Sequence, residues 1–209
     1  MTIIKPYTEI MTIIDGDAVL RHVEQCGRIC YKSESKIMDD SAKEFVANLI
    51  KNGHESALEH YSFSVRFICD RGVSHEIVRH RIASYSQEST RYCSYRGNVA
   101  FIAPPFYSED ERDQEYKVWR NAMNNAESYY NILINKGSTP GEARSVLPNS
   151  LMTQLVMTAN LREWRHFFRL RTAPAAHPQM REITVPLLDK AAELIPVVFD
   201  DIRKGVSET

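Results

Sequence analysis

The sequence predicts an α+β fold, with a mainly antiparallel sheet flanked by helices in a single domain. Two patterns lead to this prediction. Apolar residues recur at helical spacing, most clearly from Tyr116 to Leu133, whereas residues 61–69 alternate between apolar and polar side chains as a half-buried strand does. The predicted strands are few and mixed with helices, which favours α+β over a doubly wound sheet. The 209 residues, 43% of them hydrophobic, suffice for one core, so a single domain over residues 1–209 is expected.

Capping residues and helix breakers place the elements in order. A capping-box pattern at Ser41 and Glu44 predicts that the first helix follows Asp40, and Gly53 is expected to end it. Thr139 begins a short helix in the same way. The other predictions are a strand over 61–69, a helix over 73–83, a serine-rich loop, strands over 92–95, 99–102 and 151–158, a long helix over 116–133, a helix capped by Asn160 and Glu163, and a last helical region from Pro178 that is interrupted at Pro186.

Charge balance and cysteine spacing exclude several classes of protein. The formal net charge of −1 and the pI of 6.7 argue against a general binder of nucleic acid or membranes, which carries surplus positive charge. The four cysteines form no C-x-x-C pair, and His54 and His60 lack the one-turn spacing of a helical zinc pair, so no metal is expected. The N-terminal segment lacks a signal-peptide pattern, and no apolar run is long enough for a bilayer. A cytoplasmic protein with reduced thiols is predicted.

The segment RHRIASYSQESTRY, residues 79–92, concentrates basic side chains and hydroxyls. In a helix, successive residues rotate by roughly 100°, so Arg79 and Arg81 would face different directions, and R-H-R alone favours a solvated helix end. The hydroxyls that follow, together with Arg91, change this interpretation, because hydroxyls, backbone N–H groups and a guanidinium suit a phosphate.

Arg171 ends an apolar stripe on the predicted helix after Asn160. Leu161, Trp164, Phe168 and Arg171 share one face at spacings of three, four and three. A buried guanidinium without a partner is costly, so Arg171 either extends to solvent or meets a polar ligand, and spacing alone favours the first. Arg162 and His166 form a neighbouring polar face.

Motifs for other chemistries are missing from the sequence. It contains no G-x-S-x-G or S-x-x-K that would activate Ser89 as a nucleophile, and no P-loop or G-x-G-x-x-G that would bind a dinucleotide in the Rossmann manner.

Several ordered blocks resemble the flavin-dependent thymidylate synthase family. The family signature is R-H-R, seven residues and a serine, which Arg79, His80, Arg81 and Ser89 satisfy. The blocks NGHESALEH, EARSVLP, TANLREW and Leu170-Arg171 follow in family order, so the resemblance covers nearly the whole chain. It implies bound FAD, dUMP as methyl acceptor, methylenetetrahydrofolate as carbon donor, NADPH as reductant and a homotetramer with active sites between subunits.

The resemblance also implies roles for individual residues. Arg171 should lie against the uracil ring as the catalytic residue, with Ser89, Thr90 and Arg91 near the phosphate, and Arg144 should reach a neighbouring subunit's nucleotide. The full set implied for dUMP is Glu76, Arg79, Gln87, Glu88, Ser89, Thr90, Arg91, Arg144 and Arg171. The set implied for FAD is Ser56, Glu59, Arg79, His80, Arg81, Gln87, Asn160, Arg162, His166 and His177.

The chain departs from the family pattern at Ser86 and Gln87, where Asn-Glu is common, which removes one negative charge near the ligands. This departure keeps open a non-catalytic nucleotide- or flavin-binding protein on the same fold. A second alternative is an RNA-binding module in which arginines and tyrosines of residues 79–96 stack on bases, although the near-neutral charge speaks against it. Small-molecule substrates, and neither nucleic acid nor membrane, are the expected partners.

Overall fold

The structure is a computed structural model that describes residues 1–108, 110 and 113–207. Contacts within the chain divide it into two compact units, each built from separate segments. Unit 1 holds residues 1–7, 67–79 and 85–156, and unit 2 holds residues 8–66, 80–84 and the chain from residue 157 onward. The prediction of a single domain therefore stays a prediction. Among the described residues, every helix is too short or too polar to cross a membrane.

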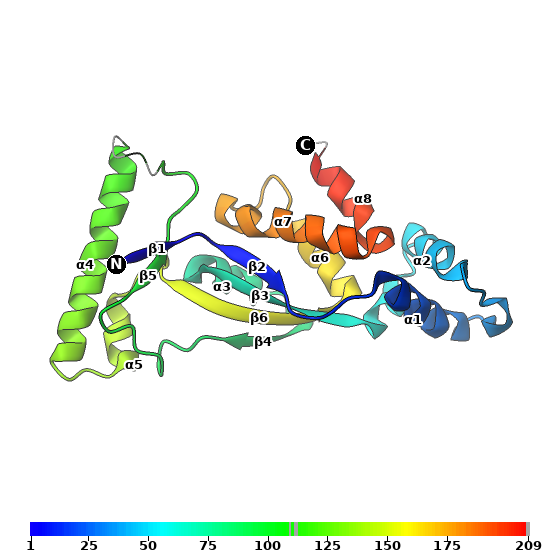
Figure 1. The fold of residues 1–209 in the computed structure, drawn as a ribbon, viewed down its shortest axis with the longest axis horizontal. Helices are drawn as coiled ribbons and strands as arrows, with labels where there is room; N and C mark the ends of the chain where they lie inside the picture. The colour runs from blue at the N-terminus through cyan, green and yellow to red at the C-terminus, as the bar shows by residue number, and fades with distance from the viewer. Residues whose placement is uncertain (109, 111–112, 208–209) are drawn as a thin grey trace. The chain divides into compact units, whose positions relative to one another are not determined.

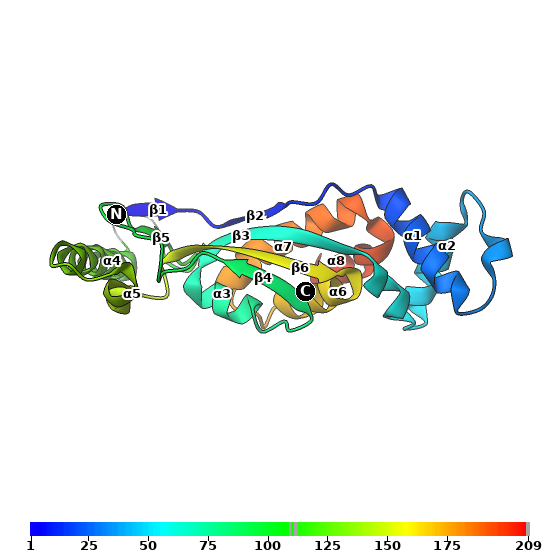
Figure 2. The same cartoon turned by 90° about the horizontal axis from the view of Figure 1, so that it is seen from below.

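The main sheet has four strands in the order β2 (Tyr7–Ile10), β3 (Ser62–Asp70), β6 (Met152–Asn160) and β4 (Ala83–Gln87), as Figure 2 shows. Its pairs are antiparallel: Ser64 near the start of β3 meets Thr158 near the end of β6, with their hydroxyl oxygens 2.7 Å apart. A separate parallel pair joins β1 (Thr2–Ile4) to β5 (Ala100–Ile102), where Thr2 is opposite Ala100. The mainly antiparallel sheet and the α+β class are thereby confirmed.

Unit 1 is built around the long helix α4 (Gln114–Asn135), which Figure 1 shows beside the short α5 (Pro140–Ala143). The predicted apolar stripe is its buried face, where Tyr116, Trp119, Met123 and Tyr130 pack against Phe101 of β5. The other helical segments of unit 1 are α3 (Arg71–Ile77) and the 3-10 turn η3 (Arg144–Val146).

Unit 2 packs its helices around a cluster of aromatic rings. Phe63 of β3 stacks on Trp164 of α6 (Leu161–Arg171) with ring centroids 4.8 Å apart, and Phe199 of α8 (Pro196–Ser207) meets Phe63 edge to face. Figure 1 shows α7 (Pro178–Leu194) beside α8, and α1 (Gly16–Ile29) beside α2 (Ser41–Lys51). The 3-10 segments η1 (Glu34–Lys36) and η2 (Glu55–His60) complete the unit.

The structure corrects several element predictions. The first helix is α1, which begins after Asp15, and not the helix after Asp40. The capping box at Ser41 does not form, because that hydroxyl donates to Glu24 at 2.8 Å. Residues 92–95 lie in a turn region and not in a strand, since Tyr92 and Cys93 both donate to the Ser89 carbonyl.

Three further boundaries differ from prediction. The helix predicted over residues 73–83 ends at Ile77, so the R-H-R motif lies beyond a helix and not within one. The first serines of the predicted loop form strand β4, which pairs with β6. Helix α7 continues through Pro186 to Leu194, because Leu187 and Leu188 anchor its buried face beyond the proline.

Candidate functional site

In unit 1, residues predicted for dUMP lie on the segment that leaves β4. The amide nitrogen of Gln87 donates to the hydroxyl of Ser74 on α3 at 2.9 Å, which fixes this side chain at the end of the strand. The next residue, Glu88, accepts a 2.5 Å hydrogen bond from the hydroxyl of Tyr95. Burial, followed by this bond to Glu88, raises the pKa of Tyr95, so the phenol stays protonated and keeps donating.

Hydroxyls and guanidinium groups meet just after Glu88. The buried Thr90 accepts a 3.0 Å hydrogen bond from Arg144, and the hydroxyl of Ser89 accepts from the backbone N–H of Arg91 at 3.3 Å. Arg91 and Arg144 are both exposed, so two fixed positive charges accompany a loop of hydroxyls. Hydroxyls and guanidinium groups are the side chains that bind a phosphate or another small anion.

The last two residues of the dUMP set that belong to unit 1 mark the end of α3. Glu76 is half-buried in its final turn, and its carbonyl accepts the backbone N–H of the exposed Arg79. Their backbones are thus joined by a turn, whereas Arg79 offers its guanidinium to solvent.

Unit 2 contains a cavity of about 490 Å³, a volume within the range of small-ligand sites. Its lining combines carboxylates, guanidinium groups, one amide, one imidazole and one apolar side chain, from η2, the end of β6, α6 and the segment before β4. The lining residues are Glu55, Glu59, Ile82, Asn160, Arg162, Glu163, His166 and Arg169. Four of these, Glu59, Asn160, Arg162 and His166, belong to the set predicted for FAD.

Local sequence explains how the cavity residues are presented. Asn160 caps α6 by accepting the backbone N–H of Glu163 at 2.9 Å, so the first turn of the helix is fixed at the cavity. Arg162 and His166, four residues apart, share the exposed face that their spacing predicts. Arg162 donates to Glu59 at 2.6 Å, and both residues line the cavity.

Other members of the predicted FAD set lie elsewhere. Ser56 lines a separate hollow of about 260 Å³, together with Cys30 and His54. His177 caps the N-terminus of α7, where its Nδ1 accepts the backbone N–H of Gln179 at 3.4 Å. Arg81 is exposed on the segment that leads into β4.

Sequence reasoning missed Glu55, Ile82, Glu163 and Arg169 as cavity residues. Arg169 lies three residues after His166, so spacing along one helix face could have identified it. Ile82 directly follows the R-H-R motif. Glu163 was interpreted only as a helix cap, although its carboxylate lies against a distant residue.

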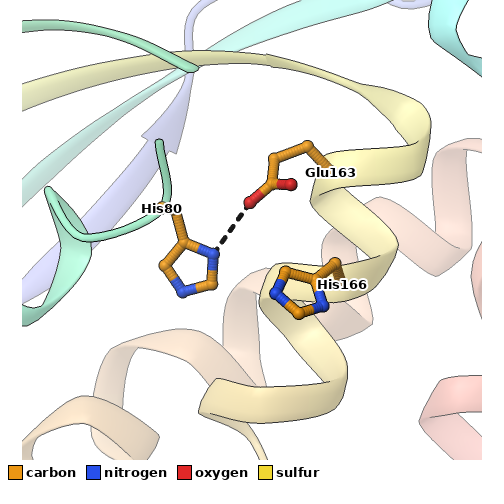
Figure 3. A group of neighbouring side chains, drawn as sticks. All are labelled: His80, Glu163 and His166. Carbon is orange, nitrogen blue, oxygen red and sulfur yellow. Dashed lines mark hydrogen bonds and ion pairs between the residues drawn. The ribbon is translucent and has the colours of Figure 1, made fainter. Parts of the chain in front are cut away.

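That distant residue is His80, whose ring is enclosed by side chains of α6. His80 Nδ1 lies 2.9 Å from the Glu163 carboxylate, drawn as the dashed line in Figure 3, and His166 meets the ring edge to face. Arg171 donates its Nε–H to His80 Nε2 at 3.1 Å. Burial lowers the pKa of His80, opposed by the hydrogen bond to Glu163 and reinforced by the charge of Arg171, so the ring is neutral at neutral pH.

Arg171 is half-buried and contacts His80, so it does not extend to solvent as spacing alone favoured. His80, Glu163 and His166 also offer three potential metal-ligand atoms within 4.8 Å of one another. The positive guanidinium of Arg171, which lies against Nε2 of His80, repels a divalent cation from this group of side chains. The contacts of His80 with Glu163 and Arg171 instead form a chain of hydrogen bonds.

The family model described as thymidylate synthase complementing protein (Thy1) matches residues 12–197. A flavin-dependent thymidylate synthase of Geobacter sulfurreducens is 35% identical over 191 residues, which cover 88% of this chain and 82% of that protein. Another, of Pyrococcus furiosus, is 36% identical over 177 residues, which cover 82% and 69%. This chain belongs to the flavin-dependent thymidylate synthase family.

A solved structure shares the fold of this chain. The crystal structure of a UMP/dUMP methylase, PolB from Streptomyces cacaoi, bound with 5-Br dUMP, matches with a TM-score of 0.78 over 96% of each chain, at 24% identity. The R-H-R motif, the α6 block and Leu170-Arg171, on which the resemblance was based, all lie inside the range that the family model matches.

The unit 2 cavity suits part of the flavin dinucleotide that the family name implies. Arg162 and Arg169 can face pyrophosphate oxygens, a carboxylate such as Glu59 can accept from ribose hydroxyls, and Ile82 offers an apolar surface. The residues present therefore fit this cofactor chemically.

Proposed function

We propose that this chain is a flavin-dependent thymidylate synthase. It converts dUMP to dTMP by reductive methylation, with methylenetetrahydrofolate as carbon donor and FAD, reduced by NADPH, as hydride source. One observation carries the proposal: in a chain of this family, four residues predicted for FAD line one cavity. The proposal treats residues 1–209 as one functional domain.

The nucleotide is assigned to the hydroxyl loop of unit 1. Ser89, Thr90 and Arg91 hold its phosphate, and Arg144, already bonded to Thr90, adds a second guanidinium. The other members of this set are Glu76, Arg79, Gln87 and Glu88. Ser89 acts here as a phosphate ligand and not as a nucleophile, because no base is hydrogen-bonded to its hydroxyl among the contacts described for it.

The flavin is assigned to the cavity of unit 2 through Glu59, Asn160, Arg162 and His166. The remaining members of that set are Ser56, Arg79, His80, Arg81, Gln87 and His177. Once reduced by NADPH, a flavin bound there would supply the hydride. Arg171 stabilises the negative charge that develops on the N3–O4 edge of uracil, because its guanidinium stays charged at any working pH and presents a planar pair of donors.

A homotetramer with active sites between subunits completes the proposal. Its support is a stripe of exposed apolar side chains on α4, at Val118, Tyr129 and Ile132, which solvent does not favour. Light scattering of the purified protein measures the assembly. A cytoplasmic location and small-molecule partners, without nucleic acid or membrane, accompany the proposed activity.

The visible spectrum of the purified protein is the first test, and flavin bands are expected. The protein is then reduced anaerobically with NADPH and mixed with dUMP and methylenetetrahydrofolate. We expect flavin oxidation together with dTMP formation, each dependent on dUMP. Bound flavin without dUMP-dependent oxidation would indicate the non-catalytic alternative, and a protein that takes up no flavin would refute the proposal.

A further inference from the structure

Two hydrogen bonds fix the same tautomer of His80. The Nε of an arginine can only donate, so His80 Nε2, at 3.1 Å from Arg171 Nε, must accept. His80 Nδ1 then carries the proton and donates to the carboxylate of Glu163 at 2.9 Å (Figure 3). The two partners thus require one protonation pattern, Glu163···H–Nδ1 and Nε2···H–Nε of Arg171.

Packing holds this chain of hydrogen bonds in place. The His80 side chain is 3% exposed, and its ring meets the ring of Phe167 edge to face at 4.9 Å between centroids. At the other end, the hydroxyl of the buried Thr184 lies 2.9 Å from the carbonyl oxygen of Arg171, where α6 ends. Both the imidazole and the backbone of Arg171 are therefore restrained.

We propose that Glu163 is a positioning residue that acts through His80 to orient the guanidinium of Arg171. This inference rests on the proposed function, since it concerns what Arg171 does to uracil. Glu163 selects the tautomer in which His80 offers Arg171 an acceptor. With Nε anchored, the plane of the guanidinium is set before the substrate arrives, which is the preorganisation that such a donor needs.

Without the Glu163 carboxylate, the acceptor at Nδ1 that selects between the two tautomers of His80 is lost. His80 can then carry its proton on Nε2, and two N–H groups would face each other, so Arg171 loses its acceptor and turns away. The His80 side chain is 3% exposed, and its influence on the uracil edge passes through its hydrogen bond with Arg171.

The kinetic test is a double-mutant cycle on flavin-loaded protein at saturating dUMP, with oxidation of the reduced flavin measured by stopped flow. The variants are Glu163→Leu, Arg171→Lys and the two combined, with rates expressed per bound flavin. We expect Glu163→Leu to slow the reaction by about a hundredfold, as small misplacements of catalytic groups can. In the Arg171→Lys background, Glu163→Leu should cause no further slowing, because coupled residues are not additive.

Two variants serve as controls. Glu163→Gln keeps a carbonyl oxygen that can accept from His80, so it should restore part of the rate that Glu163→Leu loses. Glu193→Leu makes the same change as Glu163→Leu at an exposed position on α7 and should leave the rate unchanged. Because Glu163 also lines the flavin cavity, additive losses in the cycle would show that it acts through the flavin, and would overturn the inference.

The second test needs no turnover, because it reads the protonation pattern directly. Nitrogen-15 NMR of histidine-labelled, flavin-free protein reports which ring nitrogen carries the proton, and comparison with His80→Asn identifies the His80 signals among the seven histidines. A bare Nε2 and a protonated Nδ1 are expected. A proton on Nε2 in the wild-type protein would overturn the inference.

Failure of the inference is distinguishable from failure of the proposed function. A wild-type-like rate for Glu163→Leu beside a slow Arg171→Lys protein would overturn the positioning role alone. A wild-type protein that forms no dTMP would overturn the proposed function, and the positioning role with it.

Discussion

At the scale of the residue, Ser89 tests the phosphate assignment. Ser89→Ala removes one hydroxyl from the loop in which Thr90 and Arg144 are already paired. We expect dUMP to bind more weakly by about 1.5–3 kcal/mol, the usual contribution of a hydrogen bond to a charged group, with turnover preserved once dUMP saturates. Titration of the flavin spectrum with dUMP gives the dissociation constant.

Ser94→Ala is the matched control for this change. Ser94 and Ser89 each accept the backbone N–H two residues later, at 3.4 and 3.3 Å, so the two substitutions remove the same local contact. Only Ser89→Ala should weaken dUMP binding. Normal dUMP binding with abolished turnover in Ser89→Ala would return the nucleophile role to consideration.

Arg171 shows how far residue-scale prediction reaches. Spacing within one helix placed it at the end of an apolar stripe. A charged guanidinium on a buried face needs a partner, so the sequence also indicated that Arg171 is unusual. Its partner was not recognisable from the sequence, because His80 lies 91 positions away in sequence and reaches α6 only through the fold. A separation of 83 positions from His80 likewise hid the role of Glu163, because the local capping pattern already accounted for a glutamate at this position.

At the scale of the element, prediction succeeded where local signals were enough. The long helix α4 has an uninterrupted apolar stripe, and α5 has both halves of the capping box at Thr139. The serines of β4 gave a loop pattern, yet they form a strand because β6 supplies backbone partners from residues 152–160. Pro186 was expected to interrupt α7, and tertiary packing of the residues after it outweighed that local preference.

Gly16 is an element-scale contact with a sharp prediction. A Cβ on this first residue of α1 would lie 2.1 Å from the carbonyl oxygen of Leu194, at the end of α7. Gly16→Ala must displace backbone, so we expect unfolding to require about 1–3 kcal/mol less free energy. Urea denaturation of the flavin-free protein measures the loss.

Gly205→Ala in α8 is the control for that substitution. A Cβ there meets nothing within 4 Å, so alanine should stabilise the helix by about 0.5–1 kcal/mol. Equal stability of Gly16→Ala and the wild-type protein would show that α1 and the end of α7 do not pack this closely.

At the scale of the whole molecule, stability should depend on pH through His80. Burial lowers the pKa of His80 in the folded state, so below its usual value of 6.5 the unfolded chain binds the proton first. Stability is therefore full above pH 6.5 and falls as the pH drops from 6.5 towards the folded pKa, by at most about 1.4 kcal/mol per pH unit. Urea unfolding of flavin-free protein across this window measures the slope.

Variants separate His80 from the other titrating groups. His80→Asn should reduce the slope below pH 6.5, whereas His75→Asn, at an exposed position on α3, should retain it. Asp201 acts at lower pH. Burial raises its pKa, but the hydrogen bonds and the charge of Arg165 outweigh burial and hold this pKa below its usual value. The contribution of Asp201 to stability is therefore lost only as the pH falls below the pKa of ordinary carboxylates. An unchanged slope in His80→Asn would contradict the assignment.

Cooperativity decides whether the two compact units form one domain. Strands β3 and β6 each have residues in both units, so the loss of either unit would interrupt both strands. We therefore expect a single unfolding transition. The two tryptophans report on it separately, since Trp119 lies in unit 1 and Trp164 in unit 2.

Trp119→Phe leaves only Trp164 to fluoresce, and Trp164→Phe leaves only Trp119. Within each variant, the fluorescence transition in urea is compared with the far-ultraviolet circular dichroism of the same protein, so a change in overall stability does not affect the comparison. Coinciding transitions are expected in both. If the Trp119 signal alone preceded the loss of secondary structure, unit 1 would unfold independently, because its core around α4 and β5 would then open while the aromatic cluster of Phe63 and Trp164 stayed closed.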